Sequence, residues 1–403
     1  MNERISPRAA DAALSRLPEP DPDARAHSLK LVELIRQEIA QAGGRLPFDH
    51  YMERVLYAPG LGYYAAGARK FGQAGDFVTA PELSPLFARC LARQCSEVLA
   101  GLEPGGDILE VGAGSGILAA DLLQELERLD SLPGRYLILD LSPELQQRQR
   151  RTLSQRVPHL LPRVTWLSAF PGEGFRGVVL ANELLDAMPV HRFRVSDGDI
   201  QEQFVEARGE RFELTWREPE TPGLAQAVKR VLSGLEVEDG FESEINLRAG
   251  PWLASLAVSL QQGVVLLIDY GHSRAEYYHP ARNRGTLMCH YRHRAHPDPL
   301  VYPGLQDITA HVEFTAVAEA AQGAGFQVAG YTTQAYFLMA SGLDRLVAAS
   351  DPDDVAGHMA LVEGVKRLTL PTEMGERFKV LGLIRDWSAP LLGFAMRDLR
   401  ERL

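Results

Sequence analysis

The sequence predicts an α/β fold with a doubly wound parallel sheet, an N-terminal helical region and an inserted subdomain of β-hairpins and loops. Between residues 105 and 195, short apolar stretches alternate with helix-length segments, a pattern typical of strand–helix–strand units. Strands are expected at residues 108–111, 137–140, 164–167 and 178–182. A glycine-rich turn follows the first strand and an acidic residue ends the second, as at the ligand-binding edge of such sheets.

The composition is that of a globular protein with a sizeable core. The chain has 403 residues, of which 45% are hydrophobic and 24% charged, so we expect one main domain with additions. A formal net charge of −11 argues against general binding to nucleic acid or to an anionic membrane. The longest apolar runs, such as residues 264–268, are too short to span a bilayer.

Cysteine usage and the first residues bear on the compartment. The three cysteines form no CxxC pair, which indicates a reducing compartment without a disulfide framework. They are Cys90, Cys95 and Cys289. The N-terminal residues contain no apolar core of a signal peptide, and Glu3 and Asp11 fit a transit peptide poorly. We therefore expect a cytoplasmic location.

Two regions precede the sheet. Residues 1–27 are polar and contain several prolines, which is typical of a disordered tail. Residues 28–103 are expected to be mainly helical and to include a loop that covers a ligand. The helices are expected at residues 29–42, 48–56 and 85–102.

Residues 104–403 are expected to hold the sheet and its insertions. Alternating short strands indicate antiparallel hairpins within an insertion at about 192–250. Residues 271–306 lack a periodic pattern, and a loop of this length is more often functional than incidental. The remaining elements are expected as helices at 251–262 and 307–324 and strands at 264–270, 328–333 and 378–383.

The most informative motif is the glycine-rich turn Gly112-Ala113-Gly114-Ser115-Gly116. Glycine tolerates positive φ and lets a ligand approach the backbone, and the start of the following helix offers unpaired N–H groups. Glu110 precedes the turn and gives the pattern E-x-G-x-G-x-G, whereas the G-x-G-x-x-G spacing of dinucleotide sites is absent. A carboxylate here suits the cationic amino-acid end of S-adenosyl-L-methionine (SAM), which carries a sulfonium and an ammonium and no phosphate.

A second acid supports this interpretation. Asp140 ends the next strand, 24 positions after Gly116, where a carboxylate can accept hydrogen bonds from both ribose hydroxyls. Leu141 follows it, and Ser142 and Pro143 are typical N-cap and first-turn residues. The alternative is a ligand-free strand–helix–strand unit in which Glu110 and Asp140 are merely solvated.

Polar residues also follow the fourth strand. Asn182, Glu183 and Asp186 are expected at its carboxyl end, facing the same crevice as Glu110 and Asp140. We interpret them as functional. The alternative is that Asn182 caps a following helix and Glu183 favours its dipole.

The segment at residues 75–85 has the composition of an ordered loop that folds over a ligand. Thr79 and Ser84 could donate hydrogen bonds there, and Pro81 lies between them. The alternative is a capped helix start, with Ser84 as N-cap and Pro85 at the first helical position.

Histidines and further acids are additional candidates. His272 ends the apolar strand at 264–270 and is a candidate base or substrate contact, although a histidine by itself is more often structural. Glu242 and Glu244 either face the crevice or are solvated strand residues. A further group lacks the paired ligands of structural zinc sites, so no metal is expected and a surface or substrate loop is favoured. That group is His279, Cys289, His290, His293 and His296.

With these residues in view, the chain resembles the MidA family from about residue 28 to 385. The motifs that carry the resemblance are GDFVTAPELSP at 75–85, EVGAGSG at 110–116, NELLDAMP at 182–189, IDYGH at 268–272, GTL at 285–287, YRH at 291–293, GLQDITAHVEFT at 304–315 and MGERFKV at 374–380. The family comprises Rossmann-like class I methyltransferases that depend on SAM. It includes a mitochondrial protein arginine methyltransferase needed for the assembly of respiratory complex I.

The resemblance implies a methyltransferase that uses SAM to methylate an arginine guanidinium of a protein substrate. Because the guanidinium lone pair is delocalised, carboxylates must fix its plane. We expect catalytic roles for Glu183, Asp186 and His272, followed by Glu244 and Asp269. The expected cofactor contacts are Thr79, Pro81, Ser84, Glu110, Gly112, Gly114, Gly116, Asp140, Leu141, Asn182 and Glu183.

Two other functions remain open at this point. The same fold serves small-molecule O- and N-methyltransferases, because fold does not fix substrate. A non-catalytic assembly factor that retains SAM is the third interpretation. The additions to the sheet favour a homodimer, and no nucleic-acid or membrane partner is expected.

Overall fold

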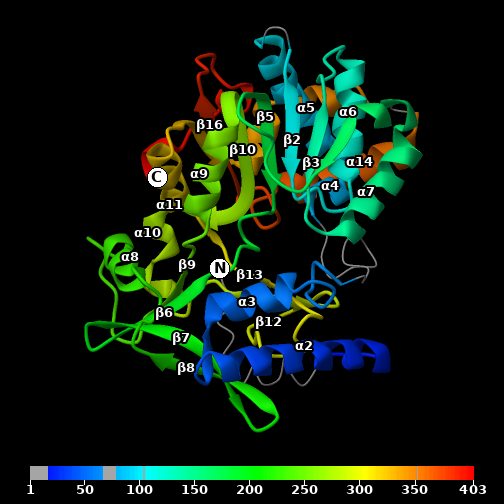
Figure 1. Cartoon of the computed structure of the whole chain (residues 1–403). Coiled ribbons are helices and arrows are strands. Elements are labelled where there is room, and N and C mark those ends of the chain that lie inside the picture. The colour runs from blue at the N-terminus through cyan, green and yellow to red at the C-terminus, as the bar shows by residue number, and fades with distance from the viewer. Residues whose placement is uncertain (1–16, 67–78, 103–104, 352) are drawn as a thin grey trace. The chain divides into compact units, whose positions relative to one another are not determined.

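A computed structural model describes residues 17–66, 79–102, 105–351 and 353–403 (Figure 1). The chain divides into two compact units. We call residues 78–186, 249–273 and 312–403 the sheet unit, and residues 1–77, 187–248 and 274–311 the hairpin unit. Most of the expected disordered tail lies outside the described residues.

The sheet unit is built on a mixed sheet in which the described strands follow the order β15-β16-β10-β5-β2-β3-β4, with β14 beside β10. The parallel strands are β2 (Asp107–Val111), β3 (Tyr136–Leu139), β4 (Val164–Leu167), β5 (Phe175–Asn182), β10 (Leu260–His272) and β14 (Val312–Glu313). β16 (Phe378–Arg385) pairs antiparallel with both β10 and the edge strand β15 (Gln327–Thr333), so β16 alone runs against the other described strands of this sheet. The doubly wound sheet predicted from the alternation of strands and helices is confirmed.

Helices cover this sheet because its central strands are apolar on both faces. In β10, Val264, Leu266 and Ile268 join a core shared with α5 and α6, while Val265 and Leu267 are buried on the opposite face. The longer helices are α5 (Pro85–Ala100), α6 (Ile117–Arg128), α7 (Pro143–Arg156), α9 (Ala249–Ser259), α11 (Phe314–Gly323) and α14 (Val355–Thr369). The shorter ones are α4 (Ala80–Leu83), η1 (Pro158–Arg163), α12 (Gln334–Ala340), α13 (Leu343–Ala348), η3 (Leu392–Phe394) and η4 (Arg400–Arg402).

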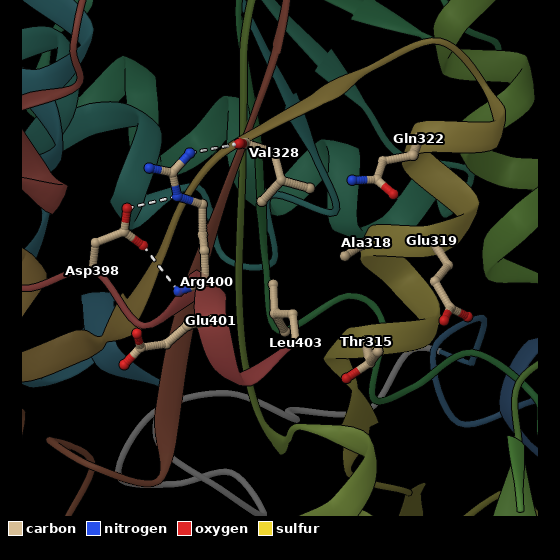
Figure 2. A pocket seen from close by; sticks show the side chains of 9 residues that line it. All are labelled: Thr315, Ala318, Glu319, Gln322, Val328, Asp398, Arg400, Glu401 and Leu403. Carbon is tan, nitrogen blue, oxygen red and sulfur yellow. Dashed lines mark hydrogen bonds and ion pairs between the residues drawn. The ribbon is translucent and has the colours of Figure 1, made fainter. Parts of the chain in front are cut away.

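The C-terminal segment of the sheet unit covers the exposed edge of β15. Asp398 Oδ1 accepts a hydrogen bond from Tyr331 N at 3.2 Å, and Arg400 Nη1 donates to Val328 O at 3.0 Å. Figure 2 shows Asp398 pairing with Arg400 beside this strand, at a pocket of about 690 Å³ that α11 also lines. These bonds satisfy edge groups that could otherwise pair with another chain.

The hairpin unit contains antiparallel strands ordered β1-β7-β6-β9, with β8 beside β7. They are β1 (Arg45–Pro47), β6 (His191–Ser196), β7 (Asp199–Arg208), β8 (Arg211–Arg217) and β9 (Glu242–Ile245). A smaller sheet contains β11 (Met288–Tyr291), β12 (Arg294–His296) and β13 (Asp307–Thr309). The helices are α2 (Pro22–Gln41), α3 (Phe48–Tyr57), α8 (Leu224–Val231), α10 (Arg274–Tyr277) and η2 (Pro280–Arg282).

Three expectations about local structure are wrong. Residues 22–27 belong to α2 instead of a disordered tail, because Asp21 caps the helix through Ala24 N at 2.9 Å and Pro22 occupies its first turn. The segment 271–306, expected as a loop, contains the short strands β11 and β12. β11 pairs with both β12 and β13, and strands of 4 and 3 residues are too short to give a periodic pattern. The helix expected at 307–324 begins only at Phe314, where Glu313 accepts a hydrogen bond from Ala316 N at 3.0 Å.

Within the described parts of the chain, no helix is both long and apolar enough to cross a membrane.

Candidate functional site

The glycine turn joins β2 to α6 in the sheet unit. Gly112, Gly114 and Gly116 have φ values of +72°, +52° and +80°, a region that side-chain-bearing residues rarely occupy. At Gly116, a Cβ would also lie 2.9 Å from Cα of Gln149 on α7. The turn therefore needs glycine for its backbone conformation, and at Gly116 also for the close approach of α7.

Glu110 is buried at the end of β2. Its Oε2 accepts a hydrogen bond from Tyr136 Oη at 2.7 Å. Burial raises the pKa of Glu110 to about 7, against the lowering effect of this hydrogen bond, and the nearby charge of Asp140 adds to the increase. A cation bound near Glu110 would therefore favour its ionised form.

Asp140 follows β3 and is also buried. Its Oδ1 accepts from Ser142 N at 2.9 Å and its Oδ2 from Gln149 Nε2 at 2.7 Å. Burial raises the pKa of Asp140, and the hydrogen bonds from Ser142 and Gln149 oppose that increase. The neighbouring Leu141 is 78% exposed. The alternative in which Asp140 is merely solvated is therefore wrong, because its carboxylate is buried and fixed by two hydrogen bonds. The exposed Leu141 places an apolar surface beside it.

Gln149 is a site residue that the sequence analysis missed. It is fully buried on α7, where Nε2 also contacts Gly114 O at 3.2 Å and Oε1 accepts from Trp166 Nε1 at 2.9 Å. One amide thus connects the glycine turn, Asp140 and Trp166. The available signal was its position between Leu145 and Leu153, since a polar residue in the buried stripe of a helix needs partners.

The segment 79–84 contacts two other parts of the site. Glu82 Oε1 accepts from Ser115 Oγ at 2.6 Å, and Ala80 N donates to Glu183 Oε1 at 3.3 Å. Pro81 is buried within α4, and Thr79 occupies the N-cap position of that helix.

Ser84 caps the following helix, as one interpretation of the sequence expected. Its Oγ accepts from Leu86 N at 3.3 Å, and Pro85 begins α5. Residues 75–78 of the expected covering loop lie outside the described residues.

Asn182 and Glu183 end β5 in a strained turn. Glu183 has a φ of +51°, which costs a residue with a side chain on the order of 1–3 kcal/mol. Asn182 Nδ2 donates to Glu183 Oε1 at 3.2 Å, and its buried Oδ1 has no hydrogen-bond partner among the described residues. The alternative that Asn182 caps a helix is wrong, because turns follow β5.

Asp186 and His272 lie at the same carboxyl edge of the sheet. Asp186 is buried, and its backbone N donates to Asp269 Oδ2 at 3.2 Å. Burial raises the pKa of Asp269 well above its ordinary value, and the charges of Asp186 and Glu183 raise it further. His272 is half-buried at the end of β10, in register with Glu313 of β14.

Two other groups of candidates lie in the hairpin unit, namely the acids of β9 and the histidine-rich group at residues 279–296. Glu244 is fully buried on β9, where its Oε2 accepts from Thr286 N at 2.8 Å, so the interpretation of Glu244 as a solvated residue is wrong. Glu242 is partly buried on the same strand and lies 3.8 Å from Arg192. No group of three or more His, Cys, Asp or Glu is arranged to hold a metal ion in the described part of the chain.

The residues at the carboxyl edge of the sheet unit fit SAM. Asn182 Oδ1, which has no hydrogen-bond partner within the described ranges, is a buried acceptor that a ligand donor can satisfy. The open backbone of the glycine turn and the carboxylates of Glu110 and Asp140 suit the ammonium and hydroxyl groups of this ligand. SAM supplies an electrophilic methyl group when bound.

Comparison with known proteins agrees with this geometry. Residues 90–332 match the model of a family described as S-adenosyl-L-methionine-dependent methyltransferase. The chain is 29% identical to the Drosophila melanogaster mitochondrial protein arginine methyltransferase NDUFAF7 homolog, over 94% of this chain and 91% of that protein. It is 30% identical to the Mus musculus mitochondrial protein arginine methyltransferase NDUFAF7, over 85% of this chain and 81% of that protein.

Two solved structures from Burkholderia thailandensis are similar over nearly the whole chain. One, crystallised with S-adenosyl-homocysteine bound, has a TM-score of 0.92 and 46% identity and covers 96% of this chain and 100% of that one. The other has a TM-score of 0.89 and 45% identity, with the same coverage.

The comparisons contradict the expected cytoplasmic location. The curated relatives from Drosophila melanogaster, Danio rerio and Homo sapiens are named as mitochondrial proteins. The cysteine argument separates reducing from oxidising compartments and cannot choose among reducing ones.

The contacts of Gln149 yield a first prediction. Gln149→Leu removes donors to Asp140 and Gly114 O and should weaken SAM binding by about tenfold or more, because a hydrogen bond to a charged group is worth roughly 1.5–3 kcal/mol. Calorimetric titration with SAM measures this effect. Gln147→Leu, on the exposed face of the same helix, is the matched control. Equal affinities of the two variants would contradict the role given to Gln149.

The burial of Glu110 yields a second prediction, on stability. Its pKa is about 7 in the folded protein against an ordinary value of 4.5, so the unfolded chain binds fewer protons between these values. The free energy of unfolding should therefore fall by on the order of 3 kcal/mol through this group as pH rises across that window. Glu110→Gln removes this contribution to the pH dependence, because the amide does not titrate. Denaturant unfolding of the ligand-free protein at pH 4.5 and pH 8 measures it, and parallel pH curves for the variant and the wild type would refute it.

The matched family model begins within α5 and ends within β15, so it includes the glycine turn, Asp140 and the turn after β5. Its match spans more than half of the chain. The chain belongs to the S-adenosyl-L-methionine-dependent methyltransferase family and uses SAM as its methyl donor.

Proposed function

We propose that this methyltransferase transfers the methyl group of SAM to an arginine guanidinium in a protein substrate. The curated relatives from Drosophila melanogaster and Mus musculus carry the name protein arginine methyltransferase and match most of the chain. The proposal takes this acceptor from them and assigns it to acidic residues of the sheet unit.

The cofactor contacts proposed here follow the carboxyl edge of the sheet. Glu110 and the glycine turn of Gly112, Gly114 and Gly116 hold the amino-acid end of SAM. Asp140 accepts hydrogen bonds from the ribose, and the exposed side chain of Leu141 supports the adenine ring. Asn182, Glu183, Thr79, Pro81 and Ser84 complete the cofactor site.

The observation that carries the choice of acceptor is the concentration of acidic groups in the turn after β5 and near the carboxyl end of β10. The charges of Asp186 and Glu183 both raise the pKa of Asp269, so three carboxyl groups share a small region. A guanidinium placed beside such a group of acids reduces their mutual repulsion, and carboxylates bind it with defined geometry.

Within this proposal, Glu183 and Asp186 orient the guanidinium and draw its positive charge away from the attacking nitrogen. Positioning of the two reactants then supplies much of the rate. His272 is assigned as a substrate contact or as the base that receives the released proton.

A test of this function uses Glu183→Gln. The variant should bind S-adenosyl-homocysteine within about threefold of the wild type, because the amide oxygen of Gln still offers the cofactor an acceptor. It should lose about 100-fold or more of its methyl transfer, because the neutral amide localises guanidinium charge poorly. Transfer is measured with radiolabelled SAM and a total protein extract, followed by identification of the labelled residue. Glu127→Gln, an exposed acid on α6, is the control.

Several outcomes would contradict the proposal. Label in a metabolite and none in protein would indicate a small-molecule methyltransferase. Loss of S-adenosyl-homocysteine binding by Glu183→Gln would move Glu183 to cofactor binding alone. The absence of any labelled product would favour a non-catalytic assembly factor.

A further inference from the structure

Asp269 is a charged residue in an otherwise apolar part of β10. It follows the buried run at residues 264–268 and is itself only 1% exposed. Burial of a carboxyl group in such a place is costly unless its hydrogen bonds repay the lost hydration. The presence of Asp269 therefore depends on the hydrogen-bond donors around it.

The partners of Asp269 are backbone N–H groups of the turn after β5. Its Oδ2 accepts from Leu185 N at 2.9 Å and from Asp186 N at 3.2 Å. Its Oδ1 accepts from Tyr270 N at 2.9 Å. The side chain thus uses one oxygen to bind the neighbouring turn and the other to bind its own strand.

The turn that Asp269 binds is the one that carries the proposed acceptor-binding acids. Glu183 continues the β5–β10 pairing through its N–H, which donates to Ile268 O at 2.9 Å, and then takes up a φ of +51°. A strained backbone of this kind persists only where surrounding contacts over-determine it. The bonds from Leu185 and Asp186 to Asp269 supply such contacts immediately after the strained residue.

We propose that Asp269 is a positioning residue for methyl transfer. It holds the turn at 183–186 so that the carboxylates of Glu183 and Asp186 are directed toward the acceptor before it binds. This inference rests on the proposed function of those two acids, and it assigns to Asp269 a role that acts through the backbone.

The charges around Asp269 agree with this role. Lys379 lies opposite it in register on β16, and the Nζ of Lys379 donates to the carbonyl oxygens of Glu376 and Arg377. On the β5 side, the nearby charges are the carboxylates of Glu183 and Asp186, which oppose ionisation of Asp269. Burial and these neighbours disfavour an acid here, whereas the backbone hydrogen bonds from Asp186 and Tyr270 favour its ionised form, so the contribution specific to Asp269 is its hold on the turn.

The test is Asp269→Asn in the full-length protein. The amide oxygen can serve either the turn or Tyr270, and its NH₂ group must then face the remaining N–H donors. We expect at least a tenfold loss of the maximal rate of label transfer from SAM to a total protein extract. Affinity for S-adenosyl-homocysteine, measured by calorimetry, should stay within threefold of the wild type.

Hydrogen exchange measures the turn directly and needs no acceptor. The amides of Leu185 and Asp186 should exchange at least tenfold faster in Asp269→Asn, whereas those of β2 and α6 should not change. Asp121→Asn is the matched control, because it removes another buried acid of the sheet unit, one that pairs with Arg156. It should alter neither the turnover rate nor the exchange of the turn.

The outcomes separate this inference from the function on which it rests. If Glu183→Gln loses transfer while Asp269→Asn retains both full turnover and slow exchange of the turn, the positioning role is refuted and the proposed function stands. A parallel loss of S-adenosyl-homocysteine binding and turnover in Asp269→Asn would show a general structural role and refute the inference. Failure of the wild-type enzyme to label protein would overturn the proposed function and this inference with it.

Discussion

Parallel pairing of β2, β5 and β10 is the constraint on which the site depends. In this register, Val111 lies opposite Ala181 and Ile268 lies opposite Asn182, so the pairing of all three strands ends at one edge of the sheet, beyond which β10 continues to His272. The groups that follow each strand therefore converge although they are distant in sequence. A slip of one residue in either pairing would turn these side chains to the other face and separate them.

The buried acids at this edge are stabilised by different partners, which explains how the unit tolerates them. Tyr136 donates to Glu110, Ser142 and Gln149 donate to Asp140, and backbone N–H groups donate to Asp269. The pKa of each acid is raised by burial, so each is held by hydrogen bonds in a place that disfavours its charge. Such an arrangement favours cationic ligands, because a bound cation reduces the free-energy cost of the buried carboxylates.

Local patterns in the sequence were sufficient for the strands, the glycine turn and the acids at strand ends. Apolar runs with defined ends identify β2 and β10, and the positive φ values of the turn explain the spacing of its glycines. Gln149 and the partners of Asp269 could not be predicted, because their contacts join residues 35 and 84 positions apart in the chain. The start of α2 was missed although Asp21-Pro22 carried its signal, since the polar composition suggested a tail.

The segment at residues 79–84 links the two ends of the proposed site. Its Glu82 accepts from Ser115 in the glycine turn, and the N–H of Ala80 donates to Glu183 after β5. A shift of α4 would therefore disturb a contact of the glycine turn and a contact of the turn after β5 together. Because β10 binds the backbone of the turn after β5 through Ile268 O and Asp269, and Ala80 N donates to Glu183, the latter is held both at its main chain and at its carboxylate. This double restraint explains how a strained residue can keep one orientation at a ligand-binding edge.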